Sequence, residues 1–224
     1  MKKVLLLTKR DLWSEKAGQL AEVVFGDRLL WMKGAVGDPF PQAAVPAELD
    51  HCISFLSPWI VPKQVLAAAA VSINFHPASR DYPGIGCYNF CLYENVAEYG
   101  ATCHHMVEKV DRGKIIGERR FRVLEQDTVE TLKLRTMIVM LAMYHDIVLS
   151  IAAGEALPEA PHSWSRQPFT RAQLNELCNI SPDMSREEIA RRIRATVYPG
   201  RGGPTVKLGG ATFRYDVPDR EPLA

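Results

Sequence analysis

The first half of the chain alternates short apolar runs with helical segments, and this alternation limits the fold more than any other feature. Four runs have the length and apolar character of strands: residues 3–8, 28–32, 51–56 and 71–75. Apolar residues recur at helical spacing over residues 11–25, and Pro62 stands just before a helical segment at residues 63–69. Strands joined by short helical crossovers predict an α/β fold with a mostly parallel sheet wrapped by helices.

The middle of the chain adds two strands and the strongest helix. The predicted strands, residues 101–107 and 114–123, flank a tight turn at Asp111-Arg112-Gly113. Apolar residues lie along one face of a long helix over residues 129–153, which ends at Gly154. We expect residues 1–157 to form the core domain of the protein.

The last third of the chain predicts a small appendage over residues 158–224. It comprises a linker at 158–168, helices at 170–177 and 187–197, and a β-hairpin of strands 205–208 and 211–215. Ser185 and Glu188 form a capping box that opens the second of these helices. The hairpin could add a strand pair to its own core or to a partner, and in the second case we expect a homodimer.

Composition restricts the partners and the compartment. The chain has 27 Lys and Arg residues against 26 Asp and Glu residues, so its net charge of +1 offers no general attraction for nucleic acid. The apolar stretches at residues 4–7 and 67–73 are far shorter than the ~20 residues of a membrane helix. Five scattered cysteines suit free thiols in a reducing compartment. We therefore expect a cytoplasmic protein whose partners are small molecules.

Three polar residues are placed where chemistry is expected. Asn74 and His76 stand at the carboxyl end of a predicted parallel strand, the edge at which open α/β sheets bind ligands. Asp111, on the turn after a later strand, could orient the imidazole of His76, and Asn74 could donate to an oxyanion. A base, a group that orients it and an oxyanion donor make up the set for acyl transfer. A structural polar cluster is the alternative.

Four motifs, in one order and near one spacing, resemble a known family. They are Asn74-Phe75-His76-Pro77, Tyr82-Pro83-Gly84, Tyr99-Gly100-Ala101-Thr102-Cys103-His104-His105-Met106 and Val110-Asp111-Arg112-Gly113-Lys114-Ile115-Ile116. Together they are similar to the N10-formyltetrahydrofolate-dependent formyltransferases, and most like the sugar N-formyltransferase branch. The resemblance implies a Rossmann-like formyltransferase core, catalytic roles for Asn74, His76 and Asp111, N10-formyltetrahydrofolate as the formyl donor, and no metal.

The resemblance also implies a set of folate-binding residues: Phe55, Leu56, Ser57, Trp59, Ile60 and Gly113. At the acceptor it implies His104, for which a buried structural histidine is the alternative. Tyr82 is a candidate for stacking on the acceptor, and Lys9 and Arg10, near the carboxyl end of the first strand, could bind a phosphate. Packing of the sheet would also account for the apolar residues of the folate-binding set and is compatible with folate contact, whereas packing of a turn would explain Tyr82 equally well. Because neighbouring residues of a strand point to opposite faces, only one of His104 and His105 can face the site.

Departures from the family pattern narrow the acceptor. Residues 8–13 replace the glycine-rich loop of the glycinamide ribonucleotide enzymes, which argues against a purine precursor. Only 25 residues follow Pro199, too few for the β-barrel with which the tRNA enzymes grip the acceptor stem. We expect the acceptor to be the amine of an amino sugar, nucleotide-linked by analogy with the family. The alternatives are another small amine (an amino acid, or an antibiotic or siderophore precursor), hydrolysis of the donor, or a non-catalytic folate or nucleotide binder.

Two further groups of residues, a cysteine pair and a basic cluster, are explained by burial and by solvent exposure. Cys87 and Cys91 have the spacing of a metal-ligand pair, but no second cysteine pair lies near them in the sequence, so we expect buried thiols. Basic residues cluster between Lys109 and Arg122 with acidic residues among them, which is typical of a solvated surface. One or two of them could still contact a phosphate.

Overall fold

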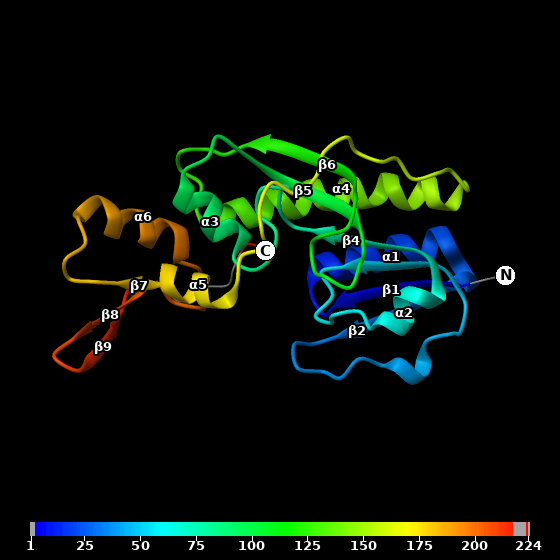
Figure 1. The fold of residues 1–224 in the computed structure, drawn as a ribbon, viewed down its shortest axis with the longest axis horizontal. Coiled ribbons are helices and arrows are strands. Elements are labelled where there is room, and N and C mark those ends of the chain that lie inside the picture. Colours follow the sequence, from blue (N-terminus) through cyan, green and yellow to red (C-terminus); the bar gives the residue numbers. More distant parts are fainter. Residues whose placement is uncertain (1–2, 217–222, 224) are drawn as a thin grey trace.

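Six strands form one sheet in the order β2-β1-β3-β4-β5-β6 in a computed structural model that describes residues 3–216 and 223 (Figure 1). The strands are β1 (Lys3–Lys9), β2 (Leu29–Gly34), β3 (Leu49–Phe55), β4 (Ala69–His76), β5 (Glu98–His105) and β6 (Ile115–Arg122). The first four are parallel, as the sequence predicts. The mixed α/β fold with a mostly parallel sheet is thereby confirmed.

The strands β5 and β6 extend the sheet in antiparallel fashion. Residues 77–97 connect β4 to β5 without returning to the amino edge of the sheet, so β5 enters beside the end of β4. His76 pairs with Thr102, and Asn74 pairs with His104. This register places His104 beside the two polar residues of β4.

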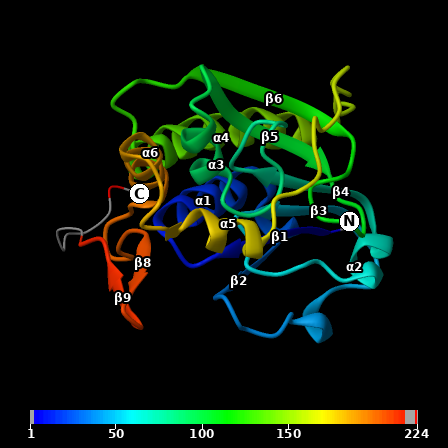
Figure 2. The same ribbon diagram turned by 60° about the vertical axis from the view of Figure 1, so that its left-hand side comes forward.

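Helices cover both faces of the sheet (Figures 1 and 2). The helices α1 (Leu12–Phe25) and α4 (Val129–Ala152) pack on one face, and α2 (Lys63–Ala68) packs on the other. The helix α4 is long and apolar enough to span a membrane, but it is the core helix of this fold. Its Tyr144 is fully buried and contacts the rings of Phe55 and Phe75 at centroid distances of 5.0 and 5.1 Å.

One helix was missed by the sequence analysis. The helix α3 (Cys87–Glu94) follows Gly86, whose φ of +77° is the left-handed conformation expected of a turn glycine. No side chain caps its amino end, so packing stabilises it. Cys87 and Cys91 are buried there as free thiols.

The C-terminal elements are α5 (Arg171–Leu177), β7 (Asn179–Ile180), α6 (Arg186–Thr196), β8 (Thr205–Leu208) and β9 (Ala211–Arg214). The predicted hairpin is confirmed, and β7 adds to it as a third, parallel strand. Leu177 and Ala195 share a buried cluster with Tyr82 and Tyr99, so α5 and α6 pack against the body of the fold. The domain boundary at 157/158 stays a prediction, and residues 1–2, 217–222 and 224 lie outside the described part.

Candidate active site

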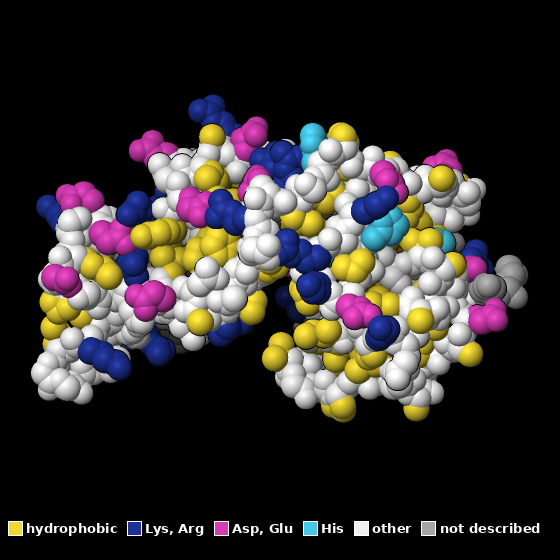
Figure 3. Space-filling model, in the orientation of Figure 1, with side chains coloured by type: hydrophobic (Ala, Val, Ile, Leu, Met, Phe, Trp, Pro, Cys, Tyr) yellow, Lys and Arg dark blue, Asp and Glu magenta, His cyan; other side chains and the backbone are white. Residues whose placement is uncertain are grey.

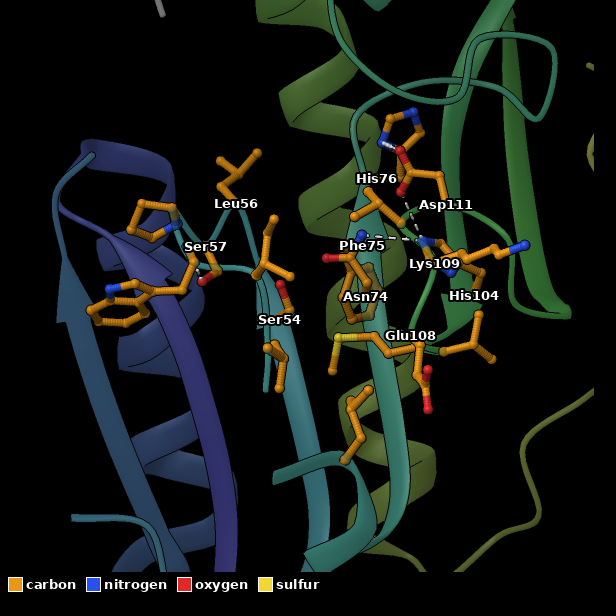
Figure 4. A pocket seen from close by; sticks show the side chains of 18 of the residues that line it. Ser54, Leu56, Ser57, Asn74, Phe75, His76, His104, Glu108, Lys109 and Asp111 are labelled. Atoms are coloured by element: carbon orange, nitrogen blue, oxygen red, sulfur yellow. Dashed lines mark hydrogen bonds and ion pairs between the residues drawn. The ribbon is translucent and has the colours of Figure 1, made fainter. Parts of the chain in front are cut away.

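A cavity of about 390 Å³ opens at the carboxyl ends of β3 and β4 (Figure 4). Its size is typical of sites for small organic ligands, which occupy ~300–1,000 Å³. Its walls come from residues 54–61 after β3, the end of β4, and the loop 106–111 that follows β5. The amide hydrogen of Met106 donates to the carbonyl of Ser72 at 2.8 Å, which holds that loop against β4.

Asn74 and His76 both line this cavity because they are two residues apart on β4 and therefore point to the same face of the sheet. Phe75 alternates with them, and its ring packs in the core on the other face. The amide nitrogen of Asn74 lies 3.1 Å from Nε2 of His104, the residue opposite it on β5. Two strands thus bring three polar side chains to one rim.

The two nitrogens of His76 both face oxygen atoms. Nε2 lies 2.9 Å from the backbone carbonyl of Tyr82, and Nδ1 lies 3.4 Å from Oδ2 of Asp111. A carbonyl oxygen only accepts hydrogen bonds, so Nε2 carries a proton and donates to it. A proton on Nδ1 would face the carboxylate. The backbone carbonyl and the carboxylate together hold the ring of His76 in place.

His104 has a similar arrangement. Its Nδ1 lies 2.8 Å from the backbone carbonyl of His105 and must donate to it. Its Nε2 lies 3.3 Å from Oδ1 of Asp111 and faces the Asn74 amide as well. When neutral, Nε2 accepts from Asn74; when protonated, it donates to Asp111. His104 lines the cavity and its neighbour His105 does not.

Asp111 lies between the two histidines and is almost fully buried. Its φ of +49° is a left-handed conformation that aspartate tolerates better than most residues. The amide hydrogen of Gly84 donates to Oδ2 at 2.8 Å. Burial alone would raise the pKa of Asp111, but the adjacent His76 and His104 and the Gly84 hydrogen bond outweigh it and hold that pKa well below its usual range. The carboxylate is therefore ionised.

Four of the six residues expected at the folate line the cavity. Leu56, Ser57, Trp59 and Ile60 line the cavity, and Ile60 is 76% exposed. Leu56 adopts a left-handed φ of +54° as the chain leaves β3, a strained conformation of the kind that clusters at functional sites. Phe55 does not line the cavity: its side chain is fully buried on the opposite face of the sheet, so the expectation for it was wrong.

Two other expected contacts lie elsewhere. Gly113 does not line the cavity. A Cβ atom at this position would come within 1.7 Å of the carbonyl oxygen of His105, so glycine allows the Asp111 turn to pack on β5. Tyr82 is 1% exposed, and its hydroxyl donates to Glu94 at 2.7 Å. Its ring therefore packs the turn and cannot stack on an acceptor, although its backbone carbonyl reaches His76.

The expected phosphate contacts are not in the cavity lining. Lys9 forms an ion pair with Asp11 at 2.9 Å, and Arg10 is exposed. Their role in binding an acceptor stays a prediction. Within the cluster 109–122, Arg120 pairs with Glu118 and Asp81, whereas Lys109 lines the cavity.

Over residues 3–216 and 223, no group of three or more His, Cys, Asp or Glu side chains could hold a metal ion.

The loop 106–110 as a cavity wall and Trp164 as a neighbour of the histidines were not predicted. The predicted strand 101–107 includes the first two residues of this loop, and no local pattern shows that the loop folds back over β4. Trp164 is a large aromatic residue in a proline-flanked polar segment, where it needs a surface to pack on. That surface is formed by His76 and His104.

The fold and the site define an α/β domain with an amide, two imidazoles and a carboxylate around one cavity at the carboxyl edge of the sheet. Residues 43–147 of this chain match the model of the formyl transferase family. The resemblance that the four motifs indicate is thereby confirmed.

Named relatives agree with this match. The chain is 26% identical over 170 residues to a GDP-perosamine N-formyltransferase of Brucella melitensis, an alignment that covers 73% of this chain and 63% of that protein. In fold it is similar to a sugar N-formyltransferase from a Shewanella species, with a TM-score of 0.77, 14% identity and 98% of each chain covered. It is also similar to the Helicobacter canadensis N-formyltransferase in complex with folinic acid and dTDP-3-aminofucose, with a TM-score of 0.74, 16% identity, and 94% of this chain and 85% of that chain covered.

Proposed function

We propose that this protein is an N-formyltransferase that moves the formyl group of N10-formyltetrahydrofolate onto the primary amine of a nucleotide-linked amino sugar. The observation that carries the proposal is the convergence of Asn74, His76 and Asp111 at the rim of one cavity, within a domain that matches the formyl transferase family. These three groups are what an acyl transfer to nitrogen requires.

The cavity suits a flat heterocycle such as the pterin of folate. Leu56, Trp59 and Ile60 supply apolar surface, while Ser54 and Ser57 supply hydroxyl groups. The indole of Trp59 is fixed by a hydrogen bond from Nε1 to the carbonyl of Asp38 at 3.0 Å and by edge contact with Phe40. The formyl group of the bound donor would then lie near Asn74 and His76.

Each polar residue has a defined role in the transfer. The lone pair of an unprotonated amine attacks the formyl carbon, and the carbonyl electrons move onto its oxygen. The amide of Asn74 donates to that oxygen, a contribution of about 3 kcal/mol for one well-placed donor. The His76–Asp111 pair, with His104, accepts the proton released by the amine nitrogen and returns it to the folate nitrogen as the bond from that nitrogen to carbon breaks.

The acceptor is inferred from the relatives and from the charge of the surface. The Brucella relative is a GDP-perosamine N-formyltransferase, and the Helicobacter structure holds a dTDP-linked amino sugar. Figure 3 shows a hollow between the part of the molecule that carries β2 and the part that carries α5, with Lys and Arg side chains at its inner end. Cationic side chains of this kind are the usual partners of phosphates.

We further propose a cytoplasmic homodimer whose partners are small molecules rather than nucleic acid or a membrane. The free thiols and the balanced charge support the compartment and the partners. The strand β9 is an edge strand of the small sheet, and Leu208, Phe213 and Tyr215, on or next to the β8–β9 hairpin, are each about half exposed. An exposed edge with apolar side chains favours pairing with a second copy.

The test is product analysis with N10-formyltetrahydrofolate, with and without a panel of GDP- and dTDP-linked amino sugars. The proposal predicts tetrahydrofolate together with a sugar heavier by one CO unit, and only slow release of formate when no amine is present. Formate formed at the same rate with and without amine would indicate hydrolysis. Transfer to free amino acids but not to nucleotide sugars would show that the proposed acceptor is wrong.

A further inference from the structure

The segment of residues 155–169, here called the strap, joins α4 to α5 across the outside of the catalytic turn. Figures 1 and 2 show it running back along the β5–β6 side of the sheet. Its backbone is tied at several points: the amide of Ala160 donates to Ile115 at 2.8 Å, and that of Phe169 donates to Pro83 at 2.9 Å. The strap is therefore anchored on both sides of Asp111.

Trp164 is the strap residue that reaches the site. Its ring makes edge contacts with His104 at 5.0 Å and with His76 at 5.7 Å between centroids. The two histidines line the cavity, and Trp164 does not. The indole thus contacts the histidine rings without forming part of the cavity wall.

The indole also holds the turn that carries Asp111. Its Nε1 donates to the backbone carbonyl of Gly113 at 2.9 Å. One side chain therefore touches both imidazoles and fixes the turn of the carboxylate between them. His76 and His104 are only 5% and 2% exposed, respectively.

We propose that Trp164 is a positioning residue for proton transfer, an inference that rests on the proposed function. By covering His76 and His104, it keeps their rings from rotating and keeps water away from them. Through Gly113 it keeps the carboxylate of Asp111 in reach of both rings. A displacement of about 1 Å between reacting groups can lower a rate ~100-fold, so the loss of this support affects turnover more than binding.

The experiment compares Trp164→Ala, Trp164→Phe and Glu159→Gln. Glu159 is the matched control: it lies on the same strap and pairs with Lys114 at 3.2 Å, but both side chains are largely exposed. Three quantities are measured: kcat and KM for donor and acceptor, the melting temperature, and the rate at which diethyl pyrocarbonate modifies His76 and His104. The last needs no turnover, so it can be read even if the proposed function fails.

For Trp164→Ala we expect a fall in kcat of about 100-fold with KM values changed little, and histidine modification several-fold faster than in the wild type. Trp164→Phe keeps a ring beside the histidines but loses the bond to Gly113, so it should protect them while kcat falls several-fold. Glu159→Gln should match the wild type in all three measurements.

The outcomes separate the two hypotheses. A wild type that transfers no formyl group to any amine would refute the proposed function. An active wild type, with both Trp164 variants equal to it in kcat and in histidine modification, would overturn the inference alone. If Trp164→Ala does not fold, Trp164→Phe decides: a kcat equal to that of the wild type at unchanged melting temperature rejects the role of the Gly113 bond and with it the proposal.

Discussion

At the scale of single residues, the carboxylate of Asp111 contacts the imidazoles of both His76 and His104. Asp111 lies 3.4 Å from His76 and 3.3 Å from His104, and it accepts a hydrogen bond from Gly84. One negative charge therefore faces ring nitrogens of both histidines, and a single side chain orients both imidazoles. In the proposed reaction, the carboxylate assists these rings as they accept the proton that the amine loses.

Replacing the carboxylate should remove this support for proton transfer. For Asp111→Asn we expect kcat to fall by ~10²–10⁴, the usual contribution of acid–base groups, while the dissociation constant for a folate analogue changes little. Asp50→Asn is the control, because Asp50 pairs with Arg28 outside the cavity. Steady-state kinetics and titration calorimetry give the two quantities. An Asp111→Asn variant with wild-type kcat would mean that another group carries the proton.

Outside the site, the lowered pKa of His51 makes the stability of the folded chain depend on pH. Burial lowers the pKa of His51 and the nearby charge of Arg28 adds to this, while Asp50 opposes it. The unfolded chain therefore takes up a proton near its ordinary pKa of about 6.5 while the folded chain resists it, so stability falls as pH falls through that range.

The variant His51→Leu should lose less stability than the wild type between about pH 7.5 and pH 5.5, the range around the ordinary pKa of histidine. The measurement is the urea midpoint at each pH. Exposed His162 supplies the control, since His162→Leu should retain the pH dependence of the wild type. Equal slopes for His51→Leu and wild type would contradict the assignment.

At the scale of secondary-structure elements, the turn between β5 and β6 sets the geometry of the site. It reverses the chain at Asp111 and packs so closely on β5 that no side chain fits at position 113. The same turn accepts the hydrogen bond from Trp164. The position of the carboxylate therefore depends on backbone packing as well as on its hydrogen bonds.

Substitutions at Gly113 and Gly117 test how far the position of the Asp111 carboxylate depends on backbone packing. A Cβ at Gly113 would lie 1.7 Å from the His105 carbonyl oxygen, whereas a Cβ at Gly117 would meet nothing within 4 Å. We expect Gly113→Ala to cost about 1–3 kcal/mol and to lower kcat, because the turn must move. Gly117→Ala on β6 should change neither. Thermal denaturation and kinetics check both, and a stable, fully active Gly113→Ala would contradict the packing argument.

How far the sequence predicts each element depends on how local its signal is. The strands β1, β3 and β4 are buried runs, and their parallel arrangement follows from the helices between them. The helix α3 was missed because Gly84 and Gly86 resemble a turn and because aromatic and cysteine residues have weak helix propensity.

The site could be predicted in part for the same reason. The motifs identify Asn74, His76, Asp111 and His104, and the register of β4 and β5 brings them together. The misassigned Phe55 depends on which face of β3 it occupies, and a strand buried on both faces gives no alternation from which to decide. Trp164 is distant in sequence from both histidines, so only the fold reveals the contact.

At the scale of the whole molecule, the small sheet β7-β8-β9 projects from the body, as Figure 2 shows. One of its two edge strands is β9, on which Phe213 is 53% exposed. We expect the wild type to be a dimer by light scattering and Phe213→Glu to be a monomer. The control is Val23→Glu on α1, where Val23 is 85% exposed, and it should stay dimeric. A wild-type monomer at micromolar concentration would contradict the dimer.

The most direct test of the central claim follows an isotope-labelled formyl group from N10-formyltetrahydrofolate to the amine of a nucleotide-linked amino sugar, in the wild type and in His76→Asn. We predict that the wild type places the label on the sugar nitrogen. The variant should bind the folate with nearly the same affinity but transfer the label orders of magnitude more slowly. Transfer at the wild-type rate by His76→Asn, or label recovered from the wild type only as formate, would contradict the account.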